Sequence, residues 1–235
     1  MFRSACVSMT LASLLAAPAS ASWLFHDGDF NDGSWGHSIY TFGGDQMGTV
    51  DIVENGGAPG GWLRYTAHLE SPNGQGGYGI RGISTSTNAV YDPGTEGAIN
   101  SVAFSITTKE SGFYVSDWVF GRLVAVQDGQ MYIAGSAEIT DDVNSWSIVN
   151  RDSITADDFH SWVPEGNTWD LDSHPDFSAG GSEITFGFMA SLFNVETLIS
   201  RGYDNFSVRI DNGVPAPGPA ALAACGLAFG ARRRR

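Results

Sequence analysis

The chain has 235 residues, of which 42% are hydrophobic and 16% charged, and its net charge at neutral pH is −14. This hydrophobic content is sufficient for a sizeable core. The acidic balance disfavours binding to nucleic acid or anionic lipid, and it suits divalent cations, neutral sugars or simple solubility in a salty setting.

The first 21 residues have the three parts of a secretory signal peptide. Arg3 supplies the positive charge, Ala5 to Ala17 form a short apolar segment, and Ala19-Ser20-Ala21 offers small residues for cleavage. A buried helix or a membrane anchor is the alternative, but the segment is too short to span a bilayer comfortably. We therefore expect signal peptidase to cleave after Ala21 and the protein to be exported.

Residues 22–214 have the size of a single domain. They contain all 26 acidic residues and seven basic ones, a net charge of −19, and Lys109 is their only lysine. Cys6 and Cys225 both lie outside this range. The domain therefore has no disulfide, thiolate nucleophile or cysteine metal site.

The domain opens with an acidic loop that contains Asp27, Asp29 and Asp32. Calcium takes about six to eight oxygen ligands from carboxylates, amides and carbonyls in a flexible loop. We expect these three aspartates to form a structural calcium site together with Asp204. The alternative is a turn in which the carboxylates accept hydrogen bonds from their own backbone. The loop is not an EF-hand, because Ser38 stands at the twelfth position.

Short runs of alternating apolar and polar residues, bounded by Gly, Asn, Asp and Ser, follow along the domain and predict strands. Asp128-Gly129-Gln130 predicts a hairpin turn, and Thr155 is a candidate cap for a helical turn over 156–159. No long segment has a helical period. About eight to ten strands without helices favour an all-β fold, a single antiparallel sandwich of jelly-roll type. The clearest predicted strands are 62–69, 99–107, 122–127, 131–139, 146–150, 184–189 and 206–210.

Tryptophans are the candidate ligand-binding residues, because an indole face packs well against the C–H groups of a pyranose ring. Trp162 and Trp169 lie in a loop-rich stretch with Asn167 and Asp170, whose side chains can bind sugar hydroxyls. Trp118 and Trp146 are further candidates. Most tryptophans of a sandwich belong to its core. Exposure of Trp162 and Trp169 on one concave face would therefore favour binding, and their burial would favour a structural role.

Signals for catalysis are weak. The five histidines show no H-E-x-x-H spacing and no G-x-S-x-G motif is present. The adjacent pairs Asp141-Asp142 and Asp157-Asp158 would diverge on a strand. A cleft with two carboxylates within about 5–10 Å of each other would indicate a polysaccharide hydrolase. We expect no enzymatic activity.

The tail combines Val214-Pro215-Ala216-Pro217-Gly218, an apolar stretch from Ala220 to Ala231, and four terminal arginines. Residues 215–235 resemble the PEP-CTERM sorting signal of bacterial envelope proteins, with VPAPG where the usual motif reads VPEP. The resemblance implies cleavage near Pro215 to Gly218 by an exosortase-type protease. It also implies a location in the cell envelope, at the cell surface or in the extracellular matrix, with membrane contact only through the unprocessed tail.

The domain itself resembles jelly-roll carbohydrate-binding modules and laminin-type or concanavalin-like sandwiches. The resemblance rests on the opening segment Asp27–Trp35 and the closing segment Gly202–Val208. It implies that the first and last strands are neighbours and that Asp204 helps to hold calcium. We therefore expect a non-catalytic module that binds an extracellular polysaccharide and no nucleic acid. A matrix protein without a discrete ligand is the alternative, and a hydrolase or lyase is a third.

Overall fold

Strands make up most of the computed structural model, which describes residues 20–43, 46–68, 79–111, 120–135, 137–138, 145–193 and 198–215. Apart from residues 20, 21 and 215, the predicted signal peptide and sorting tail lie outside these ranges, as does Trp118. The described helices are one short α-helix, α1 (Pro93–Glu96), and one 3-10 turn, η1 (Ala156–Asp158). None of them is long and apolar enough to cross a membrane.

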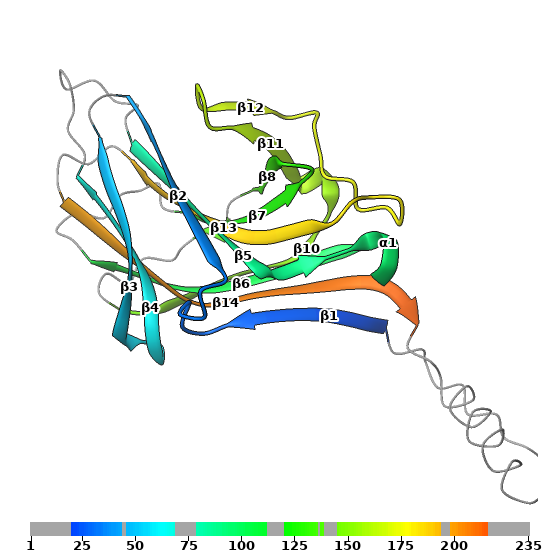
Figure 1. Cartoon of the computed structure of the whole chain (residues 1–235), viewed down its shortest axis with the longest axis horizontal. Helices are drawn as coiled ribbons and strands as arrows, with labels where there is room; N and C mark the ends of the chain where they lie inside the picture. The colour runs from blue at the N-terminus through cyan, green and yellow to red at the C-terminus, as the bar shows by residue number, and fades with distance from the viewer. Residues whose placement is uncertain are drawn as a thin grey trace, which may run out of the picture. The chain divides into compact units, whose positions relative to one another are not determined.

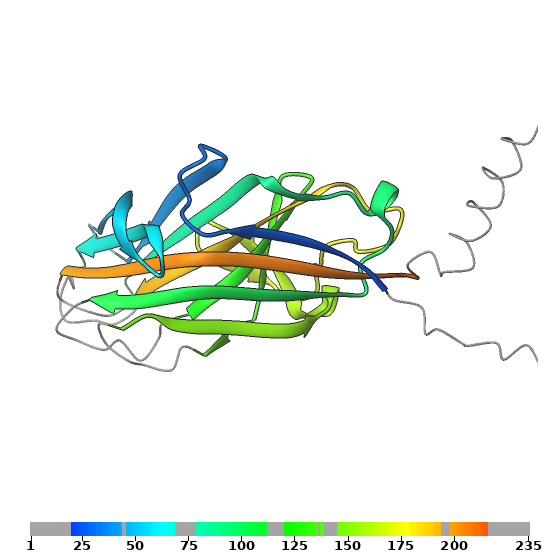
Figure 2. The ribbon, with the colours of Figure 1, turned by 90° about the horizontal axis from the view of Figure 1, so that it is seen from below.

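Six strands form one antiparallel sheet, here called sheet A. The last strand, β14, lies in its middle and pairs with the first strand, β1, whose arrow runs the opposite way (Figure 1). Seen from below, β1, β14, β6 and β10 run side by side (Figure 2). The path of sheet A is β10 (Ser147–Ile154), β6 (Ser101–Ser111), β14 (Leu198–Pro215), β4 (Gly60–His68) and β3 (Met47–Gly57), with β1 (Ser20–Asp27) beside β14.

Eight strands form the second antiparallel sheet, sheet B. Its path is β12 (Thr168–Asp170), β11 (Phe159–Val163), β8 (Gln130–Ala134), β7 (Phe120–Gln127), β13 (Ile184–Phe193), β5 (Gly79–Tyr91) and β2 (Trp35–Phe42), with β9 (Ala137–Glu138) beside β7. The turn at Asp128 and Gly129 joins β7 to β8, which confirms the predicted hairpin.

The chain crosses repeatedly between the two sheets, from β4 to β5, β5 to β6, β6 to β7 and β13 to β14. The prediction of a single all-β jelly-roll sandwich is therefore confirmed. The described residues contain more strands than the eight to ten expected, and β1, β2, β3, β5, β11 and β12 were not among the clearest predicted strands. The helical turn after Thr155 is present as η1, where the backbone N–H of Thr155 donates to the Asp158 carboxylate.

Strand β4 illustrates how alternation builds the core. Leu63, Tyr65 and Ala67 are fully buried between the sheets, whereas the residues between them point outward from sheet A. The Tyr65 ring lies against Gly82 of β5, where any side chain would overlap it. Its hydroxyl is 2.6 Å from the Ser84 hydroxyl. The small inward residues of β5 thus make room for one large ring.

Candidate functional site

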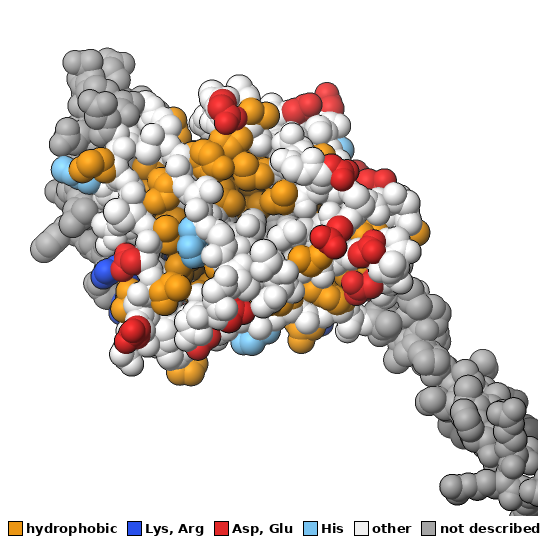
Figure 3. Space-filling model, in the orientation of Figure 1, with side chains coloured by type: hydrophobic (Ala, Val, Ile, Leu, Met, Phe, Trp, Pro, Cys, Tyr) orange, Lys and Arg blue, Asp and Glu red, His pale blue; other side chains and the backbone are white. Residues whose placement is uncertain are grey.

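The outer face of sheet B, turned away from the main core, carries a second group of apolar side chains. Figure 3 shows hydrophobic atoms gathered over β7, β8, β11 and β13 on this face. A sheet with apolar side chains on both faces must have both faces covered. Here the outer face is covered by larger side chains of the same sheet. The buried members are Ile83, Val124, Ile133, Trp162 and Met189, and Tyr40, Val126, Met131 and Trp169 pack on them.

Contact between Tyr40 on β2 and Trp162 on β11 shows that this face is strongly curved. Four strands lie between β2 and β11 in sheet B, so a flat sheet would separate the two by about 24 Å. Their ring centroids are nevertheless 5.3 Å apart, with the planes at 90°. The outer face of sheet B is therefore concave, and the two rings meet across it.

Trp162 and Trp169 both belong to this concave face, but they differ in exposure. They lie directly opposite each other in the β11–β12 hairpin, with ring centroids 6.2 Å apart. Trp162 is only 1% exposed, whereas Trp169 is partly exposed. The prediction that Trp162 stacks on a ligand is therefore not supported, because its neighbours enclose the ring. Trp169 is the one of the pair that solvent reaches.

Asn167 is hydrogen-bonded to Trp162 and Arg81, whereas the Asp170 carboxylate bonds within its own loop. Asn167 lies in the turn between β11 and β12 with a φ of 52°. Its Oδ1 accepts hydrogen bonds from Trp162 Nε1, at 3.1 Å, and from Arg81 Nη1. Asp170 is exposed, and its carboxylate accepts a hydrogen bond from the Asp172 backbone N–H at 3.0 Å. Asn167 therefore holds the Trp162 and Arg81 side chains in position on the concave face, while Asp170 caps the loop that follows β12.

Two arginines on the concave face were missed by the sequence-based prediction. Arg81 Cζ lies 5.1 Å from the Trp169 ring centroid and 5.2 Å from that of Trp162. Arg122 Cζ lies 5.5 Å from the Trp169 centroid. Burial, followed by the nearby charge of Arg122, lowers the pKa of Arg81 to about 10, so the Arg81 side chain stays cationic at neutral pH. The strand alternation of β5 and β7 points both arginines to the outer face and was the available signal.

The acidic loop after β1 is a tightly hydrogen-bonded turn. Asp27 Oδ1 accepts from the backbone N–H groups of Asp29 and Phe30, both at 3.0 Å. Asp27 Oδ2 accepts from Trp35 Nε1 at 2.8 Å. Asp29 accepts a hydrogen bond from the Asn31 side chain at 3.1 Å. Asp27 thus caps its own turn by accepting hydrogen bonds from the backbone, as in the alternative to a calcium site.

Asp204 and Asp32 differ in their surroundings. Asp204 is fully buried, and its oxygens accept from the backbone N–H groups of Ala58 and Asn205. Burial raises the pKa of Asp204, and the charges of Asp29 and Asp27 raise it further, against the effect of those two bonds. Asp32 instead binds the backbone of Ser34 and the side chain of Asn88.

The four aspartates predicted to bind calcium therefore do not form one site. In the described part of the chain, no group of three or more His, Cys, Asp or Glu side chains is arranged to hold a metal ion. The turn between β3 and β4 also packs closely on Asp204, since a Cβ at Gly57 would lie 2.6 Å from its Oδ2. Asp204 is the buried carboxylate of the four, and the charges of Asp29 and Asp27 act on its pKa.

No protein-family model and no curated protein matches the chain. Among solved structures, the chain is similar to a family 11 carbohydrate-binding module from Clostridium thermocellum, with 12% identity, a TM-score of 0.43, and coverage of 81% of this chain and 95% of that one. It is also similar to the mannan-recognising module TmCBM27, with 15% identity, a TM-score of 0.37 and coverages of 81% and 99%. The xylan-binding CBM22-1 domain of Paenibacillus barcinonensis Xyn10C gives 14% identity, a TM-score of 0.39 and coverages of 84% and 99%. These are distant resemblances of fold.

Proposed function

We propose that the domain is a non-catalytic carbohydrate-binding module and that the concave outer face of sheet B is its ligand-binding surface. The observation that carries this proposal is the partly exposed Trp169 ring with two guanidinium groups beside it. An indole face suits the C–H groups of a pyranose, and guanidinium groups donate hydrogen bonds to hydroxyls. Apolar surface with a few convergent polar groups is the usual composition of a small-ligand site.

A structural matrix protein without a discrete ligand is the second candidate. It is favoured by the burial of Trp162, since this ring and the side chains beneath it fill the concave face from within. On this alternative, Arg81 and Asn167 serve only to hold the β11–β12 hairpin on the sheet. The two candidates therefore differ in whether Trp169 contacts a ligand.

Export to the cell envelope or the extracellular matrix is part of the proposal and is supported by the sequence of residues 1–21 and 215–235. Signal peptidase and an exosortase-type protease are the proposed processing partners. Fractionation of cells that express the full chain, with and without residues 232–235, tests this. Accumulation of both forms in the cytoplasm would contradict it.

A structural calcium ion between the loop that follows β1 and Asp204 of β14 also remains a proposal. Its support is a fully buried carboxylate with two acidic neighbours. A bound divalent cation would offset this charge, with Asp204 and Asp29 as the carboxylates to hold it. Its role would be structural.

The test of the binding proposal is retention of the purified protein on a panel of insoluble polysaccharides, in calcium and in chelator. We expect retention on at least one polymer, and a loss of at least about tenfold in affinity for Trp169→Ala, as for a stacking residue at the centre of a site. Leu171→Ala, which alters a 63% exposed side chain next to β12, is the matched control. No retention on any polymer would favour the structural alternative.

A further inference from the structure

Sheet A carries a pair of tryptophans on its outer face, on the side of the sandwich opposite to the concave face. Trp62 on β4 and Trp146, just before β10, lie edge to face with ring centroids 5.6 Å apart and planes at 82°. Both rings are partly exposed. Because β14 and β6 separate β4 from β10, the two indoles reach toward each other over the middle of the sheet.

The two tryptophan rings pack against Gly202 of β14. A Cβ at this position would lie 2.7 Å from Trp62 Cε3 and 2.9 Å from Trp146 Cη2. Such distances are shorter than van der Waals contact, so the two rings fill the space that a side chain would take. The absence of a side chain at Gly202 is what allows both indoles to pack directly against the sheet.

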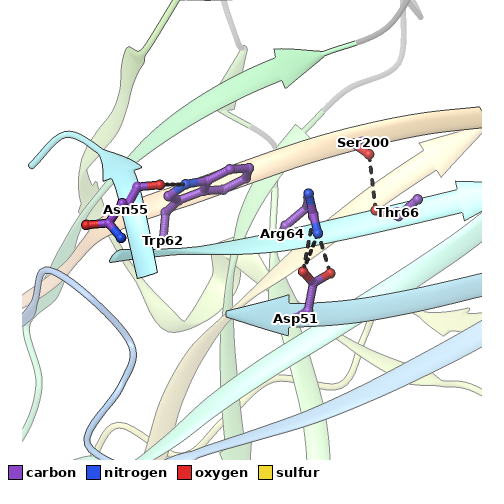
Figure 4. A network of polar contacts seen from close by, with 6 residues as sticks. All are labelled: Asp51, Asn55, Trp62, Arg64, Thr66 and Ser200. Atoms are coloured by element: carbon purple, nitrogen blue, oxygen red, sulfur yellow. Dashed lines mark hydrogen bonds and ion pairs between the residues drawn. The ribbon is translucent and has the colours of Figure 1, made fainter. Parts of the chain in front are cut away.

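Both rings are fixed by hydrogen bonds that they donate to backbone carbonyls near the end of β3. Trp62 Nε1 donates to the Asn55 carbonyl at 3.1 Å, as Figure 4 shows, and Trp146 Nε1 donates to the Gly56 carbonyl at 3.2 Å. The rings are therefore oriented before any ligand arrives. Preorganisation of this kind reduces the entropic cost of binding.

Two cations flank the rings. Gly202 is the register partner of both Arg64 on β4 and Lys109 on β6. Arg64 Cζ lies 6.0 Å from the Trp62 centroid, and Lys109 Nζ lies 5.8 Å from the Trp146 centroid. Trp62, Trp146, Arg64 and Lys109 together are called the tryptophan platform below.

The charge of the platform is opposite to that of the domain. Arg64 is neutralised by Asp51, with Nη2 and Oδ2 2.6 Å apart. No ion pair of Lys109 occurs within the part of the chain that the structure describes. The platform and Asp51 thus carry one net positive charge, on a domain whose net charge is −19. At physiological salt, charges more than about 8 Å apart are largely screened, so acidic residues farther than that from Lys109 act on it only weakly.

Hydroxyl groups continue the same face beyond Arg64. Thr66 Oγ1 and Ser200 Oγ lie 3.1 Å apart on β4 and β14, and Figure 4 shows them in line with Arg64 and Trp62. The face therefore presents, along β4, an indole, a guanidinium–carboxylate pair and paired hydroxyls. These are the groups that recognise hydroxyls and ring C–H groups of a sugar.

We propose that the tryptophan platform is a second carbohydrate-binding surface whose ligand is a polysaccharide that bears carboxylates. The indoles would contact the pyranose rings, and Lys109 would pair with a uronate carboxylate. A neutral polymer would leave the domain's only lysine without a function at this place. The proposal does not depend on the concave face of sheet B, because the two surfaces share no residue.

Affinity electrophoresis of the full chain tests the platform, with polygalacturonate, alginate and hyaluronate as soluble probes and chelator present to prevent calcium bridging. Highly methyl-esterified polygalacturonate is the neutral control with the same backbone. We expect retardation by at least one carboxylated polymer and at least about tenfold weaker binding to the ester. Trp62→Ala and Lys109→Gln should each weaken binding about tenfold, the effect expected for a central contact or a charge-assisted hydrogen bond.

The controls separate this surface from the concave face and from general charge. Arg209→Gln removes a 62% exposed cation of β14, and it should leave binding unchanged. Trp169→Ala should also leave it unchanged, whereas this variant should weaken binding to the polymers of the first proposal. Lys109→Gln keeps the proposal testable if Trp62→Ala does not fold. Equal binding of ester and acid, an equal effect of Arg209→Gln and Lys109→Gln, or no retardation by any of the three acidic polymers would overturn the proposal.

Discussion

Replacing Trp162 by alanine should destabilise the fold strongly, although this residue was first considered a ligand contact. The ring is 1% exposed and packs between Tyr40, Trp169 and Arg81. A buried tryptophan removes about 200 Å² from water, which at about 25 cal/mol per Å² gives an upper limit of about 5 kcal/mol. Measured Trp→Ala changes in cores cost about 3–5 kcal/mol. We expect the free energy of unfolding to fall by that amount.

Urea denaturation followed by far-ultraviolet circular dichroism measures this change, because it does not depend on the indole signal that the substitution removes. The midpoint should fall while the slope of free energy against urea stays constant. Trp169→Ala, which removes a partly exposed ring from the same hairpin, should cost less than half as much. A loss below about 1 kcal/mol for Trp162→Ala would show that the ring is not enclosed and would reopen its role in stacking.

Three further predictions concern packing, protonation and surface charge. Gly82→Ala should destabilise the protein by about 1–3 kcal/mol in urea denaturation, because the new methyl group overlaps the Tyr65 ring, and an unchanged midpoint would contradict the packing described. Since its pKa is raised, Asp204 contributes stability below its unfolded pKa of about 3.9 that is lost as the pH rises through its folded pKa. In chelator, the wild type should therefore gain stability relative to Asp204→Asn as the pH falls, and a difference that does not change with pH would refute this. Calcium at neutral pH should raise the melting temperature of the wild type but not of Asp204→Asn, and equal melting temperatures of the wild type with and without calcium would refute that. Asp51→Asn should cost no more than about 1 kcal/mol, because the Arg64–Asp51 pair is 42% and 41% exposed, and high salt should remove the difference from wild type.

Alternation of apolar residues was enough to predict the class of fold and several strands. Where the inward positions are apolar, as in β4, β6 and β13, the pattern predicted the strand. Strand β5 was missed because its inward positions include Gly82 and Ser84 rather than large apolar residues. Those small residues are explained only by Tyr65, whose ring and hydroxyl occupy the space beside them. Such complementarity between strands of different sheets is not visible in a local pattern.

The candidate sites were predictable to a smaller extent. Trp169 and Asn167 do lie on one concave face. The burial of Trp162, however, depends on its contact with Tyr40, which comes from β2 at the opposite edge of sheet B. The pairing of Trp62 with Trp146 depends on strand order and on a glycine in a third strand, β14. Residue type and spacing identify the candidates, whereas tertiary contacts decide which rings reach solvent.

The two candidate surfaces lie on the outer faces of different sheets, and this opposite placement has a mechanical consequence. A domain with one binding surface can only attach to a polymer chain. A domain with two surfaces facing away from each other can cross-link separate polymer chains. Each cross-link raises the effective concentration of the second polymer chain at the free binding surface. The avidity for a polymer network would therefore exceed the affinity of either surface alone. A small rigid sandwich of this kind would act as a cross-link node that stiffens a hydrated gel without any covalent chemistry.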